Sequence, residues 1–547
     1  MMGRVWSVDA IAKNASTSIY GAMVALDESP LQEGLLYVGT DDGLIRVSAN
    51  AGESWTRIES FSAVPDMSLV EDLIASSHDA QVAYAVIDNH KRGDHKPYVL
   101  KSSNQGASWG LINKGLPERG SAHAIVEDPV DPKLLYLGTE FGLFFSQDGG
   151  RSWHEFSDLP TIAVRDLEFQ KREDDLIIGT FGLGIYILDD VSPLRSSAED
   201  LSKAATLFAP RDSWIYLPDN RRGWGGKGDY GVDRYVAENP PYGAVFSYYL
   251  PEEILSLKKQ RQKAEKELAE KGGNNPYPEW DALRQEDREE EPVIMLTVTD
   301  SAGNVIRRVS GPTAKGFHRV AWDLRYPAPD PISIAEEPEF SPWESPPAGP
   351  LAVPGEYQVR LSQRVLGVWQ DLSSPQGFNL KPLITGGLVV DDQQARLRFE
   401  LEAAELFRAV SGADRAAGEM ASQLDHLLAA LQETPAAVEA PAQQARALKT
   451  RLQDLQVLLN GDSTVSSRYE PVPLSLTGRI GYISGGYWDS QSRVPQGYRD
   501  SLAIANTDYT TAVQQLQQIA ADVTALGEEA EALGAPWTPG RLPALRQ

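Results

Sequence analysis

The sequence contains no cysteine, which excludes disulfides and thiolate ligands for a metal. It contains no run of about 18 apolar residues, so no segment has the hydrophobic length of a membrane-spanning helix. Residues 1–6 lack the apolar stretch of a signal peptide. Basic residues are outnumbered, with 51 lysines and arginines against 77 aspartates and glutamates and a formal net charge of −26. This acidic balance argues against nucleic acids and anionic membranes as partners.

What the sequence does contain is an eight-residue unit that occurs three times, with Ser, Asn or Asp, Gly, Ser and Trp at fixed positions. The copies are Ser48, Asn50, Gly52, Ser54 and Trp55; Ser102, Asn104, Gly106, Ser108 and Trp109; and Ser146, Asp148, Gly150, Ser152 and Trp153. Short apolar strands precede each copy. A period of roughly 40–50 residues with several short strands per repeat is typical of β-propeller blades. A related strand pair at 175–188 lacks the unit, so we expect three to four blades in residues 1–194.

Each residue type in this unit has a structural reason. An Asp or Asn side chain accepts hydrogen bonds from backbone N–H groups two residues on and closes a turn. Glycine supplies the positive φ that other residues resist. Tryptophan covers apolar surface beside the turn, while its indole N–H can still find a partner. We therefore expect the unit to be part of the scaffold and not a ligand contact.

Two further domains are predicted after the propeller segment. Residues 195–382 indicate a linker followed by an immunoglobulin-like β-sandwich, because strands with alternating polarity flank a charged helical insert at 252–290. Residues 383–547 are rich in Ala, Leu, Gln and Glu and predict a four-helix bundle with a long crossover at 461–497. Gly412 and Pro435 are expected to separate its helices, which we place at 392–410, 413–432, 441–459 and 499–533. The predicted fold class is mainly β with an α-helical part.

The chain resembles a known bacterial family at several segments, among them Tyr20–Gly43, Leu116–Gly120, Leu159–Asp166, Asn239–Gly243 and Gly316–Arg325. That family is labelled sortilin-like, or BNR-repeat (Asp-box) glycosyl hydrolase, and the eight-residue unit is similar to its Asp-box. Family members are typically about twice as long, so the chain resembles the C-terminal half of one. The resemblance implies a periplasmic or secreted protein. Asp-boxes are also part of the scaffold in sialidases, xyloglucanases and sortilins, so their presence does not indicate a particular activity.

Candidate functional residues lie in the turns at the end of the blades opposite the eight-residue units. Loops on a rigid scaffold are where binding concentrates, and these turns should converge on one rim of the propeller. We expect this rim to bind a glycan or peptide ligand. The residues it offers are Asp42, Asp88, His90, Asp94, His95 and Glu140.

The alternative is glycoside hydrolysis, which needs two carboxylates roughly 5–9.5 Å apart. Its catalytic candidates are Asp41, Asp42, Asp88 and Glu140. A sialidase is disfavoured, because the rim loops show no arginine cluster to grip a substrate carboxylate. Whether the protein is an enzyme stays open at this point. The Asp and His residues of 88–95 are so close in sequence that a polar hairpin loop is favoured over a zinc site, and we expect neither metal nor cofactor.

An arc of three or four blades exposes a flank of apolar strand surface, and such a surface requires a partner. We therefore expect the missing blades to come from the same protein or from another chain. A glycan or protein ligand at the rim is the other expected partner, and nucleic acid is not expected.

Overall fold

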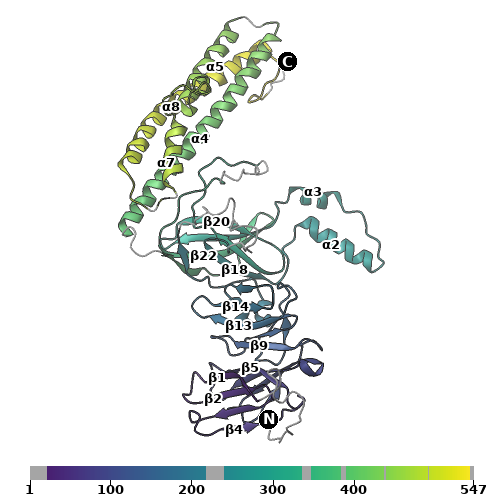
Figure 1. The fold of residues 1–547 in the computed structure, drawn as a ribbon. Coiled ribbons are helices and arrows are strands. Elements are labelled where there is room, and N and C mark those ends of the chain that lie inside the picture. The colour runs from purple at the N-terminus through teal and green to yellow at the C-terminus, as the bar shows by residue number, and fades with distance from the viewer. Residues whose placement is uncertain are drawn as a thin grey trace. The chain divides into compact units, whose positions relative to one another are not determined.

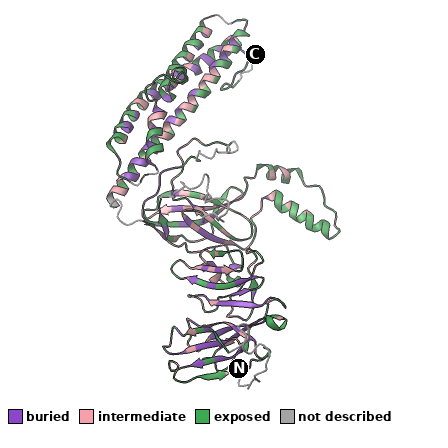
Figure 2. Ribbon diagram, in the orientation of Figure 1, coloured by how far each residue is buried: buried purple, intermediate pink, exposed green. Residues whose placement is uncertain are grey.

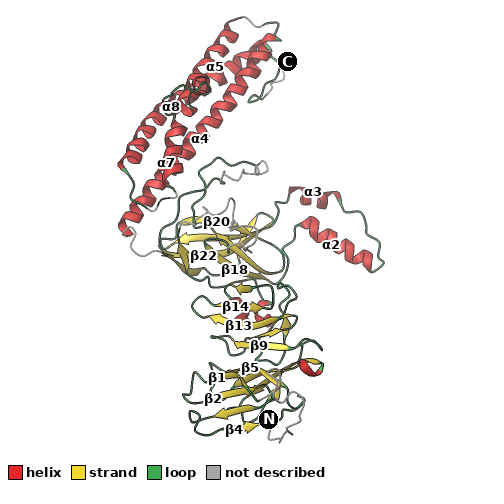
Figure 3. Ribbon diagram, viewed as in Figure 1, coloured by secondary structure: helices red, strands yellow, loops and turns green. Residues whose placement is uncertain are grey.

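The computed structural model describes residues 21–216, 240–334, 346–383, 390–436, 439–488, 490 and 492–542. The chain divides into two compact units, Met1–Ala204 and Ala205–Gln547. Most of the regular secondary structure of the first unit is strand, whereas the second unit contains strands followed by long helices (Figure 3). The predicted fold class, mainly β with an α-helical part, is confirmed. The further division of the second unit at residue 383 stays a prediction.

The first unit consists of four antiparallel sheets that follow one another in chain order (Figure 1). We call them blades 1 to 4, and three have four strands while the last has three. Their strands are β1 (Met23–Glu28), β2 (Leu36–Thr40), β3 (Ile45–Ser48) and β4 (Thr56–Ile58); β5 (Leu69–Ala75), β6 (Ala83–Asn89), β7 (Asp94–Ser102) and β8 (Gly110–Leu111); β9 (Ala122–Glu127), β10 (Leu135–Thr139), β11 (Gly142–Ser146) and β12 (His154–Glu155); and β13 (Val164–Gln170), β14 (Asp175–Thr180) and β15 (Ile185–Leu188). This arrangement is the predicted partial propeller of three to four blades.

The first strands of successive blades, β1, β5, β9 and β13, pack against one another. Apolar side chains fill the spaces between the sheets, and most central strand residues are buried (Figure 2). Carboxylates on these strands add hydrogen bonds across the joints. Asp27 Oδ2 accepts from the N–H of Ala75 (2.7 Å), and Asp72 Oδ2 accepts from the N–H of Ile125 (2.9 Å). Each such bond connects one blade to the next.

Each eight-residue unit forms the turn between the third and fourth strands of its blade. In the first unit, Ser48 Oγ accepts from the backbone N–H of Asn50 (3.3 Å) and Gly52 (2.8 Å). Asn50 Oδ1 accepts from the N–H of Ser54 (2.9 Å). The other two units repeat these bonds at equivalent atoms. The Asn or Asp side chain therefore accepts a backbone hydrogen bond as predicted, but the predicted donor, two residues on, was wrong. The serine closes the bond two residues on, and the Asn or Asp reaches four residues on.

The glycines and tryptophans of the units also occupy matching positions. Gly52, Gly106 and Gly150 have φ values of +90°, +78° and +88°. The indole N–H groups of Trp55 and Trp109 each donate to the carbonyl of the glycine in their own unit, at 3.0 Å. Trp153 instead donates to the carbonyl of Ile112 in the preceding blade, at 2.6 Å. It is 2% exposed, whereas Trp55 is 38% exposed, so the third unit also helps to join two blades.

The second unit begins with a β-sandwich. One sheet contains β16 (Thr206–Leu207), β18 (Ala244–Leu250) and β21 (Gly316–Trp322), and the other contains β17 (Ser213–Ile215), β19 (Val293–Asp300), β20 (Val305–Gly311), β22 (Gly355–Val365), β23 (Val368–Asp371) and β24 (Gln376–Pro382). Side chains such as Trp322, Phe246 and Phe378 share one core. The predicted helical insert forms two helices, α2 (Leu257–Glu270) and α3 (Trp280–Arg288).

The helical part contains α4 (Val390–Gln432), α5 (Glu439–Asn460), α7 (Leu476–Tyr487) and α8 (Gln496–Leu533) around one apolar core, and the short α6 (Ser463–Ser466) has no buried residue. Two predictions about it were wrong. Gly412 does not end a helix, because a glycine in helical conformation costs only about 1 kcal/mol, and α4 runs through it. The predicted crossover also contains α7, whose apolar side chains join the core. Among the helices of the described ranges, none is long and apolar enough to cross a membrane.

Candidate functional site

A cavity of about 390 Å³ lies in the first unit at the blade ends opposite the eight-residue turns. It is lined by His90, His95, Arg119, Gly120, Ser121, His123, Glu140, Phe141 and Arg165. These residues come from the β6–β7 connection and the start of β7 in blade 2, from β9 with the segment that leads into it and the β10–β11 turn in blade 3, and from β13 of blade 4. Three blades thus contribute to one cavity.

His123 forms the buried part of this cavity, with 4% of its surface exposed. Its Nε2 lies 2.8 Å from Glu140 Oε2, and its Nδ1 lies 2.7 Å from Arg165 Nη1. The same guanidinium nitrogen is 2.9 Å from Nε2. A carboxylate only accepts and a guanidinium only donates, so we assign the ring hydrogen to Nε2 and the acceptor role to Nδ1. Glu140, His123 and Arg165 therefore form one hydrogen-bonded chain.

A β-bulge places these side chains. In the first strand of each blade the pairing with the second strand skips one residue. The skipped residues are Val24, Glu71, His123 and Arg165 in blades 1 to 4. Glu71 Oε1 lies 3.9 Å from His123 Nδ1, so the bulge residues of blades 2, 3 and 4 are neighbours. A bulge redirects a side chain relative to the regular pleat, and bulges are common beside functional sites.

Asp88 lies beneath His90 at the mouth of the cavity, with 2% of its surface exposed. It accepts hydrogen bonds from the His90 backbone N–H (3.1 Å) and from His90 Nδ1. Burial raises the pKa of Asp88, but the interactions with His90 and with the Ser121 hydroxyl outweigh burial and hold the pKa below its usual value. Asp88 therefore stays a carboxylate near neutral pH and fixes the position of the imidazole.

Asp94 supports the same connection from the side. It accepts from Tyr98 Oη (2.8 Å) and from Asn89 Nδ2 (3.1 Å). Partial burial raises its pKa, yet these bonds lower it by more, so the pKa lies below the usual value. The carbonyl of His95 accepts from the N–H of Gly120 (2.7 Å), which joins the blade 2 connection to the segment before β9.

Asp41 and Asp42 lie in the β2–β3 turn of blade 1 and do not line the cavity. Asp42 is fully buried and accepts from Thr40 Oγ1 (2.6 Å), and Asp41 accepts from the N–H of Ala22 (2.8 Å). Of the four turns expected to converge, those of blades 2 and 3 meet at the cavity. Among the named ligand-binding candidates, His90, His95 and Glu140 line it, and Asp88 lies directly below.

Sequence reasoning missed Arg119, Ser121, His123 and Arg165. Arg119 and Arg165 belong to segments that carry the family resemblance, and that was the only signal in the sequence. His123 sits in a strand pattern that gives no hint of a bulge. The described residues hold no group of three or more His, Asp or Glu side chains arranged to bind a metal.

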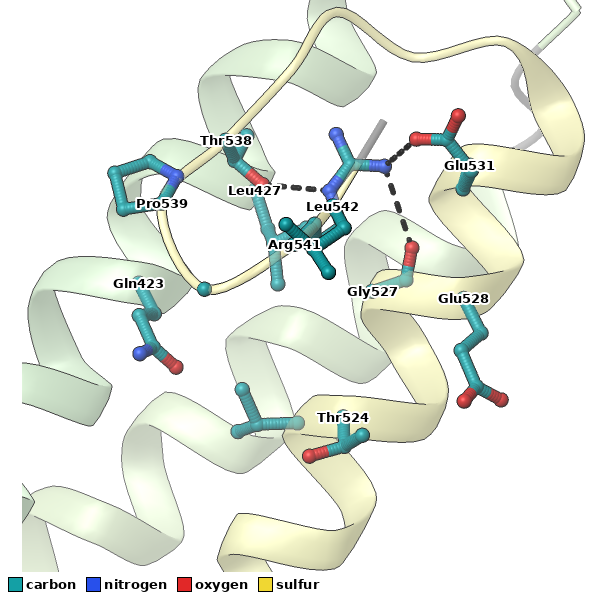
Figure 4. A pocket seen from close by; sticks show the side chains of 12 residues that line it. Gln423, Leu427, Thr524, Gly527, Glu528, Glu531, Thr538, Pro539, Arg541 and Leu542 are labelled. Carbon is teal, nitrogen blue, oxygen red and sulfur yellow. Dashed lines mark hydrogen bonds and ion pairs between the residues drawn. The ribbon is translucent and has the colours of Figure 1, made fainter. Parts of the chain in front are cut away.

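A second cavity, of about 370 Å³, lies in the second unit between α4, α8 and residues 538–542 (Figure 4). Figure 4 shows Arg541 directed at α8, where it donates to Glu531 Oε2 (2.6 Å) and to the carbonyl of Gly527 (3.4 Å). Its Nε also donates to Thr538 Oγ1 (2.9 Å). These bonds hold the segment after α8 against the helix. The charged lining therefore has a packing role, and we place the candidate functional site in the first unit.

No protein-family model matches the chain. It is similar to a xyloglucanase from a Paenibacillus species, with 26% identity over 163 residues, which is 27% of this chain. The chain spans only 16% of the length of that relative.

Solved structures with some similarity include a xyloglucanase of Xanthomonas campestris (14% identity, 65% of this chain, 46% of that chain, TM-score 0.28). Another is a GH74 enzyme of Niastella koreensis (16% identity, 31% of this chain, 29% of that chain, TM-score 0.26). A third is YCF48 bound to a D1 peptide (12% identity, 32% of this chain, 57% of that chain, TM-score 0.24). Similarity at this level says nothing about activity.

Proposed function

We propose that the protein is an extracytoplasmic binding or scaffold protein that holds a glycan or peptide ligand in the cavity of blades 2 to 4. The observation that carries this proposal is the convergence of His90, His95, Glu140, Phe141 and Arg165 on one cavity. Its volume of about 390 Å³ lies within the range of roughly 300–1,000 Å³ that is usual for small-ligand sites. Exposed polar side chains above a buried polar floor suit a ligand that offers several hydrogen-bonding groups.

The experiment is a binding screen of soluble glycans and short peptides on the purified chain, with the variants His95→Ala, Glu140→Gln and Phe141→Ala. Each variant should weaken the binding of any ligand found with the wild-type chain. Arg172→Gln is the matched control, because Arg172 is exposed in the same unit, pairs with Glu173 and does not line the cavity. Binding that all three cavity variants leave unchanged would refute the proposal.

The alternative is a glycoside hydrolase, which the similarity to a xyloglucanase favours. The proposed catalytic candidates remain Asp41, Asp42, Asp88 and Glu140. The measurement is the release of reducing ends from xyloglucan and related β-glucans. Hydrolysis that is lost in Glu140→Gln and kept in Arg172→Gln would support this function. An inactive wild-type chain that still binds these glycans would favour the binding role.

We also propose that further blades, from the same protein or from another chain, cover the outer face of blade 4. Ile185 and Ile187 of β15 are 71% and 59% exposed, and Phe181 and Leu183 in the preceding turn are exposed as well. The intervening Tyr186 and Leu188 pack into the core on the other face. A periplasmic or secreted location agrees with this proposal and with the acidic composition.

A further inference from the structure

We propose that the ligand of this cavity is an acidic oligosaccharide, whose uronate carboxylate binds between Arg119 and Arg165. This inference rests on the proposed binding function and specifies its ligand. The chain has 77 acidic and 51 basic residues, yet its rim cavity is lined by two arginines, three histidines and a single carboxylate. A site that reverses the charge balance of the surrounding protein indicates a ligand of negative charge.

The arginines are placed for this role by the fold. Arg165 is the bulge residue of β13, and its side chain is exposed while His123 anchors its Nη1 from below. A guanidinium presents five N–H donors in a rigid fork that matches a carboxylate. Arg119 is exposed on the segment that leads into β9 and lines the same cavity. Two guanidinium groups thus approach the cavity from different blades.

Three carboxylates near the cavity each lie beside a histidine, and Glu71 Oε1 is the most distant one at 3.9 Å from His123 Nδ1. Glu140 Oε2 lies 2.8 Å from His123 Nε2, and Asp88 is buried beneath His90. Glu140 and Asp88 accept hydrogen bonds from these imidazoles, and this solvation of the two carboxylates reduces the repulsion that an incoming carboxylate would meet. Arg119 and Arg165 are the permanently charged donors of the cavity lining, and a ligand carboxylate would bind to them.

Phe141 favours a sugar acid over a peptide carboxylate. Its ring is half exposed at the edge of the cavity, where a ring face can stack on the C–H groups of a pyranose. The remaining lining groups are imidazoles, a hydroxyl and guanidiniums, which bond to sugar hydroxyls as well as to a carboxylate. The relative named xyloglucanase agrees with a glycan as the ligand class.

The test is calorimetric titration of the full chain with trimers of oligogalacturonate and oligoglucuronate, beside the fully methyl-esterified trimers. The esters keep the sugar rings and remove the charge. We expect the acids to bind about tenfold more tightly than the esters, since a hydrogen bond to a charged group contributes roughly that much. Arg165→Gln and Arg119→Gln should each remove this preference, and Arg172→Gln should keep it. Raising the salt concentration should weaken the binding of the acids but not that of the esters.

Each other outcome overturns the inference. If acids and esters bind equally, the ligand class is wrong while the binding function stands. The same holds if the chain binds only neutral glycans or the carboxyl ends of peptides and Phe141→Ala weakens that binding. If no glycan or peptide binds the wild-type chain, both proposals fail. Arg119→Gln changes an exposed segment, so it tests the role of charge even where Arg165→Gln disturbs the folding of β13.

Discussion

One strand position supplies two of the side chains that line the rim cavity. The bulge position of each first strand holds Val24, Glu71, His123 and Arg165 in turn. His123 and Arg165 line the cavity, and Glu71 lies 3.9 Å from His123. The blades therefore share a β-bulge at the same position, but each blade has a different side chain there.

Asp72 should make the stability of the first unit depend on pH. Burial raises its pKa to about 6, although the N–H groups of Ile125 and Leu73 and the charges of Asp166 and Asp27 also act on it. The folded state then holds a proton that the unfolded state releases near pH 4. The stabilisation is complete below pH 4 and is lost as the pH rises through 6.

The measurement is urea unfolding of the wild type and of Asp72→Asn between pH 4 and 7, followed by tryptophan fluorescence. The stability of the variant relative to the wild type should rise over this range by on the order of 1 kcal/mol. Asp158→Asn, at an exposed position, is the control and should show no such trend. A difference between Asp72→Asn and wild type that does not vary with pH would contradict the prediction.

Gly106 and Gly93 both have φ of +78°, so replacing either glycine costs the same backbone strain. A comparison of the two therefore isolates the additional cost of a steric clash. A Cβ at Gly106 would lie 2.7 Å from Val47 Cγ2, whereas a Cβ at Gly93 meets no atom within 4 Å. Gly93→Ala should cost only the strain of a left-handed residue, about 1 kcal/mol. Gly106→Ala should cost roughly 1–3 kcal/mol more, because the extra methyl overpacks the joint between blades 1 and 2. Thermal unfolding measures both losses of stability, and equal losses would show that the contact with Val47 does not destabilise Gly106→Ala.

At the scale of elements, local propensity predicted the strands and turns of the first unit better than the helices of the second. The eight-residue turn is closed by hydrogen bonds to its own side chains, so its local sequence is enough to predict its structure. The segment 461–497 contains Gly478, Gly481, Gly485 and Gly486, which indicated a crossover. It nevertheless forms α7, because Leu476, Ile480, Ile483 and Tyr487 are buried in the shared core. Burial outweighed the cost of the glycines, and only the tertiary structure provides that burial.

Helix α4 offers a test of this explanation. Gly412 and Gly418 have helical backbone conformation, and a Cβ at either would meet no atom within 4 Å. Gly412→Ala and Gly418→Ala should therefore each stabilise the helical part by about 1 kcal/mol. Circular dichroism during thermal unfolding measures the change. A loss of stability in both variants would show that the glycines have a role in packing.

At the scale of the whole molecule, the outer face of blade 4 should govern association. Apolar strand surface of this kind associates unless it is covered. We expect the isolated chain to self-associate in sedimentation velocity experiments, and the double variant Ile185→Lys, Ile187→Glu to sediment as a monomer. Val305→Lys, at an exposed position of the second unit, is the control and should behave as wild type. A wild-type chain that is monomeric at all concentrations would contradict the prediction.

The sequence by itself determined the repeat and predicted three to four blades, because each turn is specified by residues within eight positions of one another. It also located the connections that carry His90, His95 and Glu140. The tertiary structure alone decided that Arg119, His123 and Arg165 join them. Strand pairing sets the position of each bulge, and residues from three blades become neighbours only when the sheets pack face to face.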